Sequence, residues 1–158
     1  MFNIFKKNLS LKAPISGKVI DLCEVPDEAF SKKMIGDGIA IDTTGDIVVA
    51  PCDGTIEFIM DTKHAFAMST DKGIEILVHV GINTVNLNGN GFEVLVSPKD
   101  KVLSGTPILK LDRDVFKNNN ISLITPVLIT IHDKLKSLNG LVGSDVSAGE
   151  CNVIEYRL

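Results

Sequence analysis

The sequence consists mainly of short apolar runs, rich in Val and Ile, that are separated at close intervals by Gly, Pro or Asp. Runs of this length and composition suit β-strands, and the Gly and Pro residues between them suit tight turns. The pattern therefore predicts an all-β fold, an antiparallel β-sandwich or barrel with only short helical turns. The expected strands lie at 18–22, 38–42, 46–50, 55–60, 73–80, 107–111 and 152–156, and the expected helical turns at 27–31, 112–117 and 132–138.

An internal pseudo-repeat refines this fold. The segment Ala13-Pro-Ile-Ser-Gly17 aligns with Ala50-Pro-Cys-Asp-Gly54, and residues 101–105 align with residues 145–149. In the first pair Pro sets φ and Gly accepts positive φ, so each copy suits a tight turn that enters a strand. Two copies of such a unit predict a pseudo-symmetric β-sandwich. Lipoyl- and biotinyl-carrier domains have similar repeats, but they need an exposed Lys at the tip of a hairpin. Lys72 is the candidate here, and its neighbours Asp71 and Gly73 do not make that signal specific.

The length of 158 residues fits one domain with a single core. We expect this domain at 12–158, preceded by an N-terminal tail at 1–11. Phe2, Phe5 and Leu9 would share one side of a helix in the tail, which could then be a weakly amphipathic membrane-surface anchor. Its short length favours a mobile tail instead.

Composition excludes several classes of function. The formal net charge is −4, which argues against nucleic acid because phosphate backbones are bound by surplus Lys and Arg. A basic partner fits this charge better. No apolar stretch approaches the ~20 residues of a membrane-spanning helix. The Cys residues are three in number, with no CxxC spacing, which indicates reduced thiols and a cytoplasmic protein.

His79 lies in an apolar run whose period-2 pattern predicts the direction of its side chain. Ile76, Val78 and Val80 share one face of the expected strand, and that face is wholly aliphatic. Leu77 and His79 share the other face. We therefore expect the aliphatic face to enter the core and His79 to point outward beside Leu77.

His64 precedes this strand across a turn signal, Ser69-Thr-Asp-Lys-Gly73. A hairpin that turns on Asp71 and Lys72 places His64 directly opposite His79, with Cβ atoms about 4.5–5.5 Å apart. A bulge at Gly73 would shift the register by one residue and remove the direct facing.

Two outward, adjacent histidines suit phosphoryl transfer. A neutral imidazole nitrogen is a good nucleophile near neutral pH, and the charge on a phosphoryl group in flight needs N–H donors, one of which a second imidazole supplies. Thr62, two residues before His64, could orient that ring through its hydroxyl.

The same pair could instead be two of three zinc ligands, completed by a carboxylate such as Asp27 or Glu75. This alternative is a zinc-dependent hydrolase of similar β-sandwich fold that uses His64 and His79. The sequence contains no HxH or HExxH element, which disfavours that reading.

Two stretches, Thr62-Lys-His-Ala-Phe66 and 73–87, resemble the signature of the glucose-specific enzyme IIA (EIIA type-1) components of the phosphoenolpyruvate-dependent sugar phosphotransferase system. The resemblance covers the chain from about residue 12 to its end. Further motifs follow in family order: Ala13 to Gly17, Val25 to Asp27, Gly36 to Ala40, Val49 to Thr55 and Gly89 to Phe92.

The resemblance implies a β-sandwich and a phosphotransferase component that turns over no small molecule by itself. It implies that His79 accepts a phosphoryl group on its tele nitrogen from the phosphocarrier protein HPr and donates it to the IIB domain of a glucose-type permease. It also implies that His64 binds the phosphoryl oxygens and supports donation, and that Thr62 orients His64. The membrane would be reached only through the permease.

The resemblance further implies a partner-binding surface. Asp27 matches one of two acidic residues that ring the site. The second acidic position, four residues after the phosphorylated histidine, is Asn83 here. With one carboxylate lost, we expect a longer-lived phosphorylated form and weaker affinity for a basic partner. The apolar docking positions are Phe30, Met34, Ile35, Met60 and Leu77.

No cofactor is required for this carrier role. In some members of the family, both active-site histidines bind zinc at an interface with a regulated enzyme, which donates a carboxylate as a further ligand. The resemblance implies that His64 and His79 could bind zinc in the same way, and that the chain could regulate other enzymes or transporters.

Overall fold

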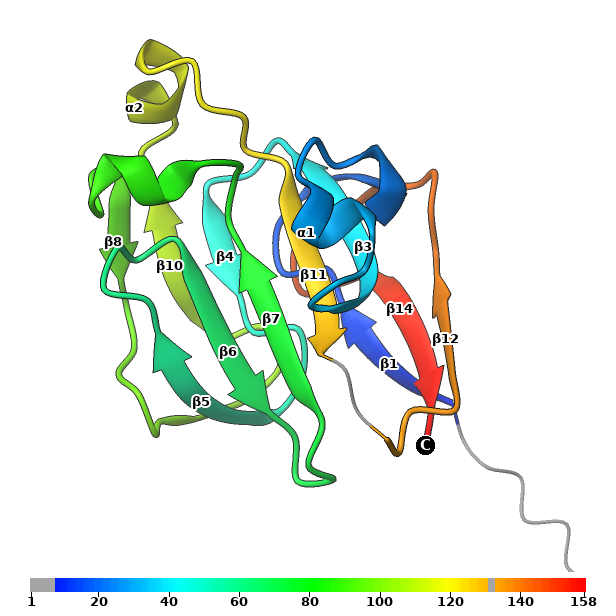
Figure 1. Ribbon diagram of the computed structural model, residues 1–158. Coiled ribbons are helices and arrows are strands. Elements are labelled where there is room, and N and C mark those ends of the chain that lie inside the picture. The colour runs from blue at the N-terminus through cyan, green and yellow to red at the C-terminus, as the bar shows by residue number, and fades with distance from the viewer. Residues whose placement is uncertain (1–7, 131–132) are drawn as a thin grey trace, which may run out of the picture.

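The computed structural model describes residues 8–130 and 133–158, and within them the chain folds into antiparallel sheets (Figure 1). An eight-stranded sheet has the order β13-β2-β3-β11-β7-β6-β5-β9, and two three-stranded sheets have the orders β1-β14-β12 and β4-β10-β8. The strands are β1 (Leu9–Lys12), β2 (Gly17–Asp21), β3 (Gly36–Thr43), β4 (Ile47–Val49), β5 (Gly54–Ile59), β6 (Ala65–Ser69), β7 (Glu75–His79), β8 (Phe92–Val94), β9 (Lys101–Val102), β10 (Pro107–Leu111), β11 (Thr125–Thr130), β12 (Ser137–Gly140), β13 (Asp145–Val146) and β14 (Asn152–Arg157).

Over residues 8–130 and 133–158, helix is confined to short pieces, which confirms the predicted fold class. These are η1 (Leu22–Glu24), α1 (Glu28–Ser31), η2 (Thr84–Leu87) and α2 (Arg113–Asn118). Asp27 and Asp112 each accept a backbone N–H at the start of an α-helix, as their N-terminal position suggests. None of the described helices is long and apolar enough to span a bilayer.

Two expectations about elements need correction. The helical turn expected at 132–138 is wrong over its described part, because Ser137–Gly140 forms β12 against β14. Tertiary pairing with an available strand edge outweighs local helix propensity there. In addition, β1 lies partly within the expected tail, and Leu11 is fully buried. Residues 1–7 lie outside the described part of the chain.

The internal repeat of the sequence is reproduced as matched hydrogen bonds. Val49 N–H donates to the Pro14 carbonyl (2.7 Å), and Lys12 N–H donates to the Pro51 carbonyl (2.9 Å). The two copies thus bond each other reciprocally. The second pair of matched bonds runs from Gly105 N to Ala50 O (2.9 Å) and from Gly149 N to Ala13 O (2.8 Å).

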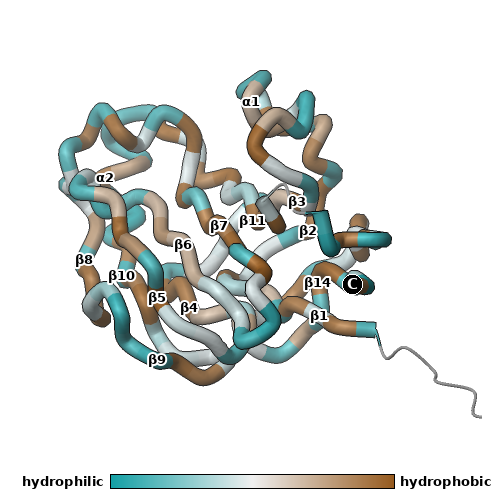
Figure 2. Tube along the Cα trace, turned by 60° about the horizontal axis from the view of Figure 1, so that its bottom comes forward, coloured by the Kyte–Doolittle hydropathy of each residue, from teal (hydrophilic) through white to brown (hydrophobic). Residues whose placement is uncertain are grey.

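The eight-stranded sheet has one face in the main core and one outer face that is only partly covered. η1 and α1 cover the outer face over β3 and β11, where a second cluster contains Leu22, Val25, Phe30, Ala40, Ile82 and Leu128 (Figure 1). Hydrophilic residues gather at exposed turns such as those around α1 (Figure 2). The cover ends beside β7, and this boundary is where the histidines lie.

Candidate functional site

The last residue of β7 is His79, and its side chain lies on the outer face of the sheet. Ile76, Val78 and Val80 are fully buried in the main core, as the alternation of the sequence predicts. His79 is half-buried because Phe30 of α1 packs against it, with ring centroids 4.9 Å apart.

The hairpin between β6 and β7 has a register one residue away from the direct His64–His79 pairing. Ala65 lies opposite His79, and Ser69 lies opposite Glu75. The turn contains one more residue than expected: Thr70 N–H donates to Ile74 O (2.9 Å), and Gly73 adopts φ +81°. Left-handed backbone at Gly73 makes this longer turn accessible, so the direct pairing is wrong and the shifted register holds.

The two imidazoles nevertheless meet. Their ring centroids are 4.8 Å apart, and the planes are nearly perpendicular at 77°. His64 lies just before β6, after Lys63, whose φ of 62° interrupts the strand alternation. The His64 carbonyl accepts from Val80 N–H at 2.7 Å. The departure from strand geometry thus turns a buried His64 side chain, only 3% exposed, toward His79.

The hydrogen bond of His79 defines its tautomer. Its Nδ1 lies 2.9 Å from the Gly81 carbonyl oxygen. A carbonyl only accepts hydrogen bonds, so Nδ1 carries the proton and the neutral ring keeps a lone pair on Nε2. The side chain therefore presents a nucleophilic nitrogen of fixed position.

Thr62 contacts His64 as the sequence suggests. The Thr62 Oγ1 lies 2.7 Å from His64 Nδ1. When this hydroxyl donates to Nδ1, the neutral ring carries its proton on Nε2 and can donate it to a bound group. Burial, with a smaller contribution from His79, lowers the pKa of His64 to about 4.

Burial also lowers the pKa of His79, opposed by the Gly81 carbonyl and by the negative charge of Asp27. Asp27 is half-buried and accepts from Ala29 N–H at 2.9 Å through one carboxylate oxygen. Both imidazoles are therefore neutral near pH 7, which leaves His79 nucleophilic.

The apolar surface around the pair differs in part from expectation. Met34 (64% exposed), Ile35 and Met60 are exposed, and Leu77 is half-buried. Phe30 is only 3% exposed and packs on His79 and the second apolar cluster, so its place among the docking residues stays a prediction.

Two further exposed apolar residues were missed in the sequence. Phe58 of β5 lies opposite Ala67 on the outer face of the sheet, and Val85 of η2 is also exposed. The bulge between Ile56 and Phe58 changes the alternation of β5, so a period-2 reading assigns Phe58 to the wrong face. Val85 follows no strand pattern.

The resemblance leads one to expect Asp at position 83. Asn83 is exposed and directly precedes η2 as its N-cap residue. Its φ of 60° and ψ of 21° are left-handed, a conformation that Asn tolerates better than most residues. Its side chain makes no capping bond, so the amide is available to an incoming group.

The histidine pair offers two possible metal ligands. In the described part of the chain, no three His, Cys, Asp or Glu side chains form a group that could hold a metal ion. The donor set therefore fits a zinc ion only if a further ligand comes from elsewhere, because zinc sites have at least three protein ligands.

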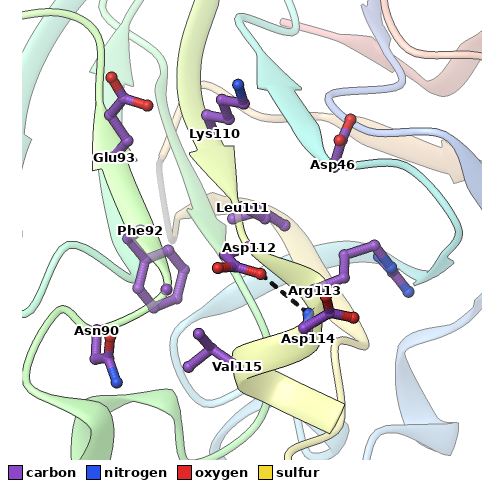
Figure 3. A pocket seen from close by; sticks show the side chains of 11 residues that line it. Asp46, Asn90, Phe92, Glu93, Lys110, Leu111, Asp112, Arg113, Asp114 and Val115 are labelled. Atoms are coloured by element: carbon purple, nitrogen blue, oxygen red, sulfur yellow. Dashed lines mark hydrogen bonds between the residues drawn. The ribbon is translucent and has the colours of Figure 1, made fainter.

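A hollow of about 600 Å³ near the start of α2 contains neither histidine (Figure 3). Asp46, Glu93, Asp112 and Asp114 give it an acidic lining. Its Arg113 guanidinium is already bound to Thr43 and Gly45 oxygens. The hollow thus carries no paired nucleophile and base, and the histidine pair remains the better site.

Fold and site together define a class: a β-sandwich protein that presents a neutral imidazole pair beside an exposed apolar surface. Residues 9–135 match the family model described as phosphoenolpyruvate-dependent sugar phosphotransferase system, EIIA 1. The chain belongs to this family, which makes it a component of a phosphoryl-transfer system for sugar transport.

Individual relatives agree. A glucose-specific EIIA component of Borreliella burgdorferi is 49% identical over 138 residues, covering 86% of this chain and 73% of the relative. One from Staphylococcus aureus (strain N315) is 39% identical over 153 residues, covering 97% and 92%. The structure of glucose permease IIA from Mycoplasma capricolum aligns with a TM-score of 0.86 at 37% identity, covering 98% of this chain and 99% of the other.

Proposed function

We propose that His79 carries the phosphoryl group, accepting it from phosphorylated HPr and donating it to the IIB domain of a glucose-type permease. The observation that carries this proposal is the bond from His79 Nδ1 to the Gly81 carbonyl (2.9 Å). It leaves Nε2 with a free lone pair on the outer face of the sheet, beside exposed apolar side chains that suit docking to another protein.

In the transfer step, the His79 Nε2 lone pair attacks the phosphorus of the phosphohistidine on HPr. A new N–P bond forms on Nε2 while the N–P bond of the donor breaks, and its electron pair returns to the donor imidazole. The proton stays on His79 Nδ1, which goes on donating to the Gly81 carbonyl. The positive charge that develops on the ring is favoured by Asp27, whose field already acts on His79. In donation to IIB, a nucleophile of IIB attacks the same phosphorus, the N–P bond on His79 Nε2 breaks, and its electron pair returns to the His79 imidazole.

His64 acts on the phosphoryl oxygens. With Thr62 donating to Nδ1, His64 Nε2–H is free to donate to an oxygen of the transferring group. In the unphosphorylated chain, burial lowers the pKa of His64 to about 4, so the ring that meets the incoming phosphoryl group is neutral and donates through one nitrogen. A neutral donor stabilises the transition state without trapping the phosphorylated form.

Docking would use the apolar surface made of Met34, Ile35, Met60 and Leu77, extended by Phe58 and Val85. Asp27 supplies the acidic group of its rim, and Asn83 supplies a neutral amide where a second carboxylate would pair with a basic partner. The docked partner would exclude water from the histidine pair and strengthen its electrostatics.

The remaining expectations belong to the same proposal. Residues 12–158 would act as one EIIA domain in the cytoplasm, with no turnover of small molecules by itself and no cofactor for the carrier role. His64 and His79 would hold a zinc ion only with a ligand from a regulated partner, and such an ion would bridge the two proteins.

A coupled transfer assay tests the proposal. The chain is incubated with phosphoenolpyruvate, enzyme I and HPr, and acid-labile phosphate is measured before and after adding a IIB domain. His79→Ala should take up no phosphate. His64→Ala should accept phosphate from HPr but donate it poorly to IIB, and His132→Ala, at the remaining histidine of the sequence, should behave as wild type. Full labelling of His79→Ala would contradict the proposal.

A further inference from the structure

Thr84, the first residue of η2, is a fully buried polar side chain beside the site. Its hydroxyl donates to the Val80 carbonyl at 2.7 Å. The bond closes the chain between the end of β7 and η2, across the segment that contains Gly81. Thr84 therefore acts on the backbone directly after His79.

The Val80 residue that Thr84 holds is bonded on both sides. Its N–H donates to the His64 carbonyl at 2.7 Å, and its carbonyl accepts from Thr84. Its side chain is fully buried in the main core. The backbone of Val80 is therefore held in place between the two histidine segments. The hydrogen bond from the Thr84 hydroxyl is the second of the two bonds that hold it.

Gly81 follows with φ +78°, and its carbonyl receives the His79 Nδ1–H at 2.9 Å. The same peptide unit contains the Ile82 N–H, which donates to the Ser122 carbonyl at 3.0 Å. A Cβ at Gly81 would lie 2.5 Å from the Thr84 methyl carbon, so the Thr84 methyl packs closely against Gly81. Thr84 therefore restrains both the start of this turn and its middle.

We propose that Thr84 is a positioning residue for phosphoryl transfer: through Val80 and Gly81 it holds the carbonyl that keeps the proton on His79 Nδ1 and leaves Nε2 free. The effect on transfer rests on the proposed function of His79, whereas the effect on the tautomer does not. Loss of the hydroxyl leaves the Val80 carbonyl unpaired in the interior, and the turn relaxes to satisfy it.

If Thr84 had a purely structural role, replacing it would lower the stability of the chain and would leave the His79 tautomer ratio unchanged. Thr125 provides the matched control, because it is also fully buried and its hydroxyl also donates to a backbone carbonyl, that of Leu123 at 3.0 Å. Removing either hydroxyl should lower stability, but only Thr84 is bonded to the turn that follows His79.

The experiment compares wild type, Thr84→Val, Thr84→Ser and Thr125→Val at one pH where the imidazoles are neutral. Long-range ¹H–¹⁵N spectra of uniformly ¹⁵N-labelled protein report which nitrogen of His79 carries the proton, and a labelling assay reports the rate of phosphate uptake from HPr. We expect Thr84→Val to lower the ratio of Nδ1–H to Nε2–H tautomer roughly fivefold, as for one lost net hydrogen bond, and to slow uptake. Thr125→Val should keep the wild-type ratio and rate, and Thr84→Ser, which keeps the hydroxyl but lacks the methyl group, should lie between wild type and Thr84→Val.

Equal tautomer ratios in Thr84→Val and Thr125→Val would overturn the proposal, as would a Thr84→Ser variant that behaves like Thr84→Val. If Thr84→Val does not fold, Thr84→Ala replaces it, since Ala also lacks the hydroxyl and adds no bulk. If no variant and not even wild type takes up phosphate, the proposed function fails, while the spectra still decide the role of Thr84.

Discussion

The buried position of His64 predicts a specific loss of stability in acid. Its pKa falls from the ordinary value of 6.5 to about 4 in the folded chain. Between these values the unfolded chain binds a proton that the folded chain does not, so stability decreases as the pH falls through this window. From pH 7.5 to pH 4.5 the loss is about 2.5 kcal/mol as an upper limit, because one pKa unit corresponds to about 1.36 kcal/mol.

Solvent screening at the mouth of the site reduces the expected loss to about 1–2 kcal/mol. The measurement is urea unfolding of wild type and His64→Gln at several pH values between 7.5 and 4.5. Gln does not titrate and keeps a polar partner for Thr62, so the difference between the two proteins isolates His64. His79, whose pKa is also lowered, is present in both proteins, so its own contribution cancels apart from its smaller effect on His64.

Parallel stability curves for wild type and His64→Gln would refute the reasoning. So would an NMR titration in which the His64 ring protonates near pH 6.5. Either result would mean that His64 is hydrated in the folded chain, and its assignment as a neutral, one-nitrogen donor to the phosphoryl group would then be wrong.

Three further predictions follow from the same geometry. Gly81→Ala should destabilise the chain by more than the about 1–3 kcal/mol that strained backbone costs, since φ is +78° and a Cβ there would also lie 2.5 Å from the Thr84 methyl carbon and 2.8 Å from the Ser122 carbonyl oxygen; thermal unfolding checks it, with Gly73→Ala, whose φ is +81° but whose Cβ meets nothing within 4 Å, losing less. Thr62→Val should slow donation to IIB roughly fivefold by removing one net hydrogen bond, and an unchanged donation rate would contradict the role of Thr62. Asn83→Asp should shorten the life of the phosphorylated form and tighten HPr binding at low salt more than at high salt, as measured by phosphate release and calorimetry; equal binding at both salt concentrations would count against it.

The sequence predicts the parts of this fold that depend on alternation. The face of His79 follows from the aliphatic positions at 76, 78 and 80, because burying those side chains leaves the odd positions on the outer face. The pseudo-repeat likewise predicts that both Ala-Pro copies lead into a strand, and Gly17 and Gly54 begin β2 and β5.

Features set by single backbone conformations could not be predicted. The hairpin register depends on how many residues the turn around Gly73 uses, and the direction of His64 depends on left-handed backbone at Lys63. Burial of Phe30 depends on how α1 packs on β3 and β11, which is a tertiary contact. These conformations decide that the two rings meet although their strands are out of direct register.

The central claim is that the Nε2 atom of His79 receives the phosphoryl group. The most direct measurement is NMR of the uniformly ¹⁵N-labelled chain after phosphorylation by HPr, with ¹⁵N–³¹P coupling used to identify the bonded nitrogen. We predict a single coupling, to Nε2 of His79, with the Nδ1 proton retained against the Gly81 carbonyl. A coupling to His79 Nδ1, or to a ring nitrogen of His64, would contradict the account.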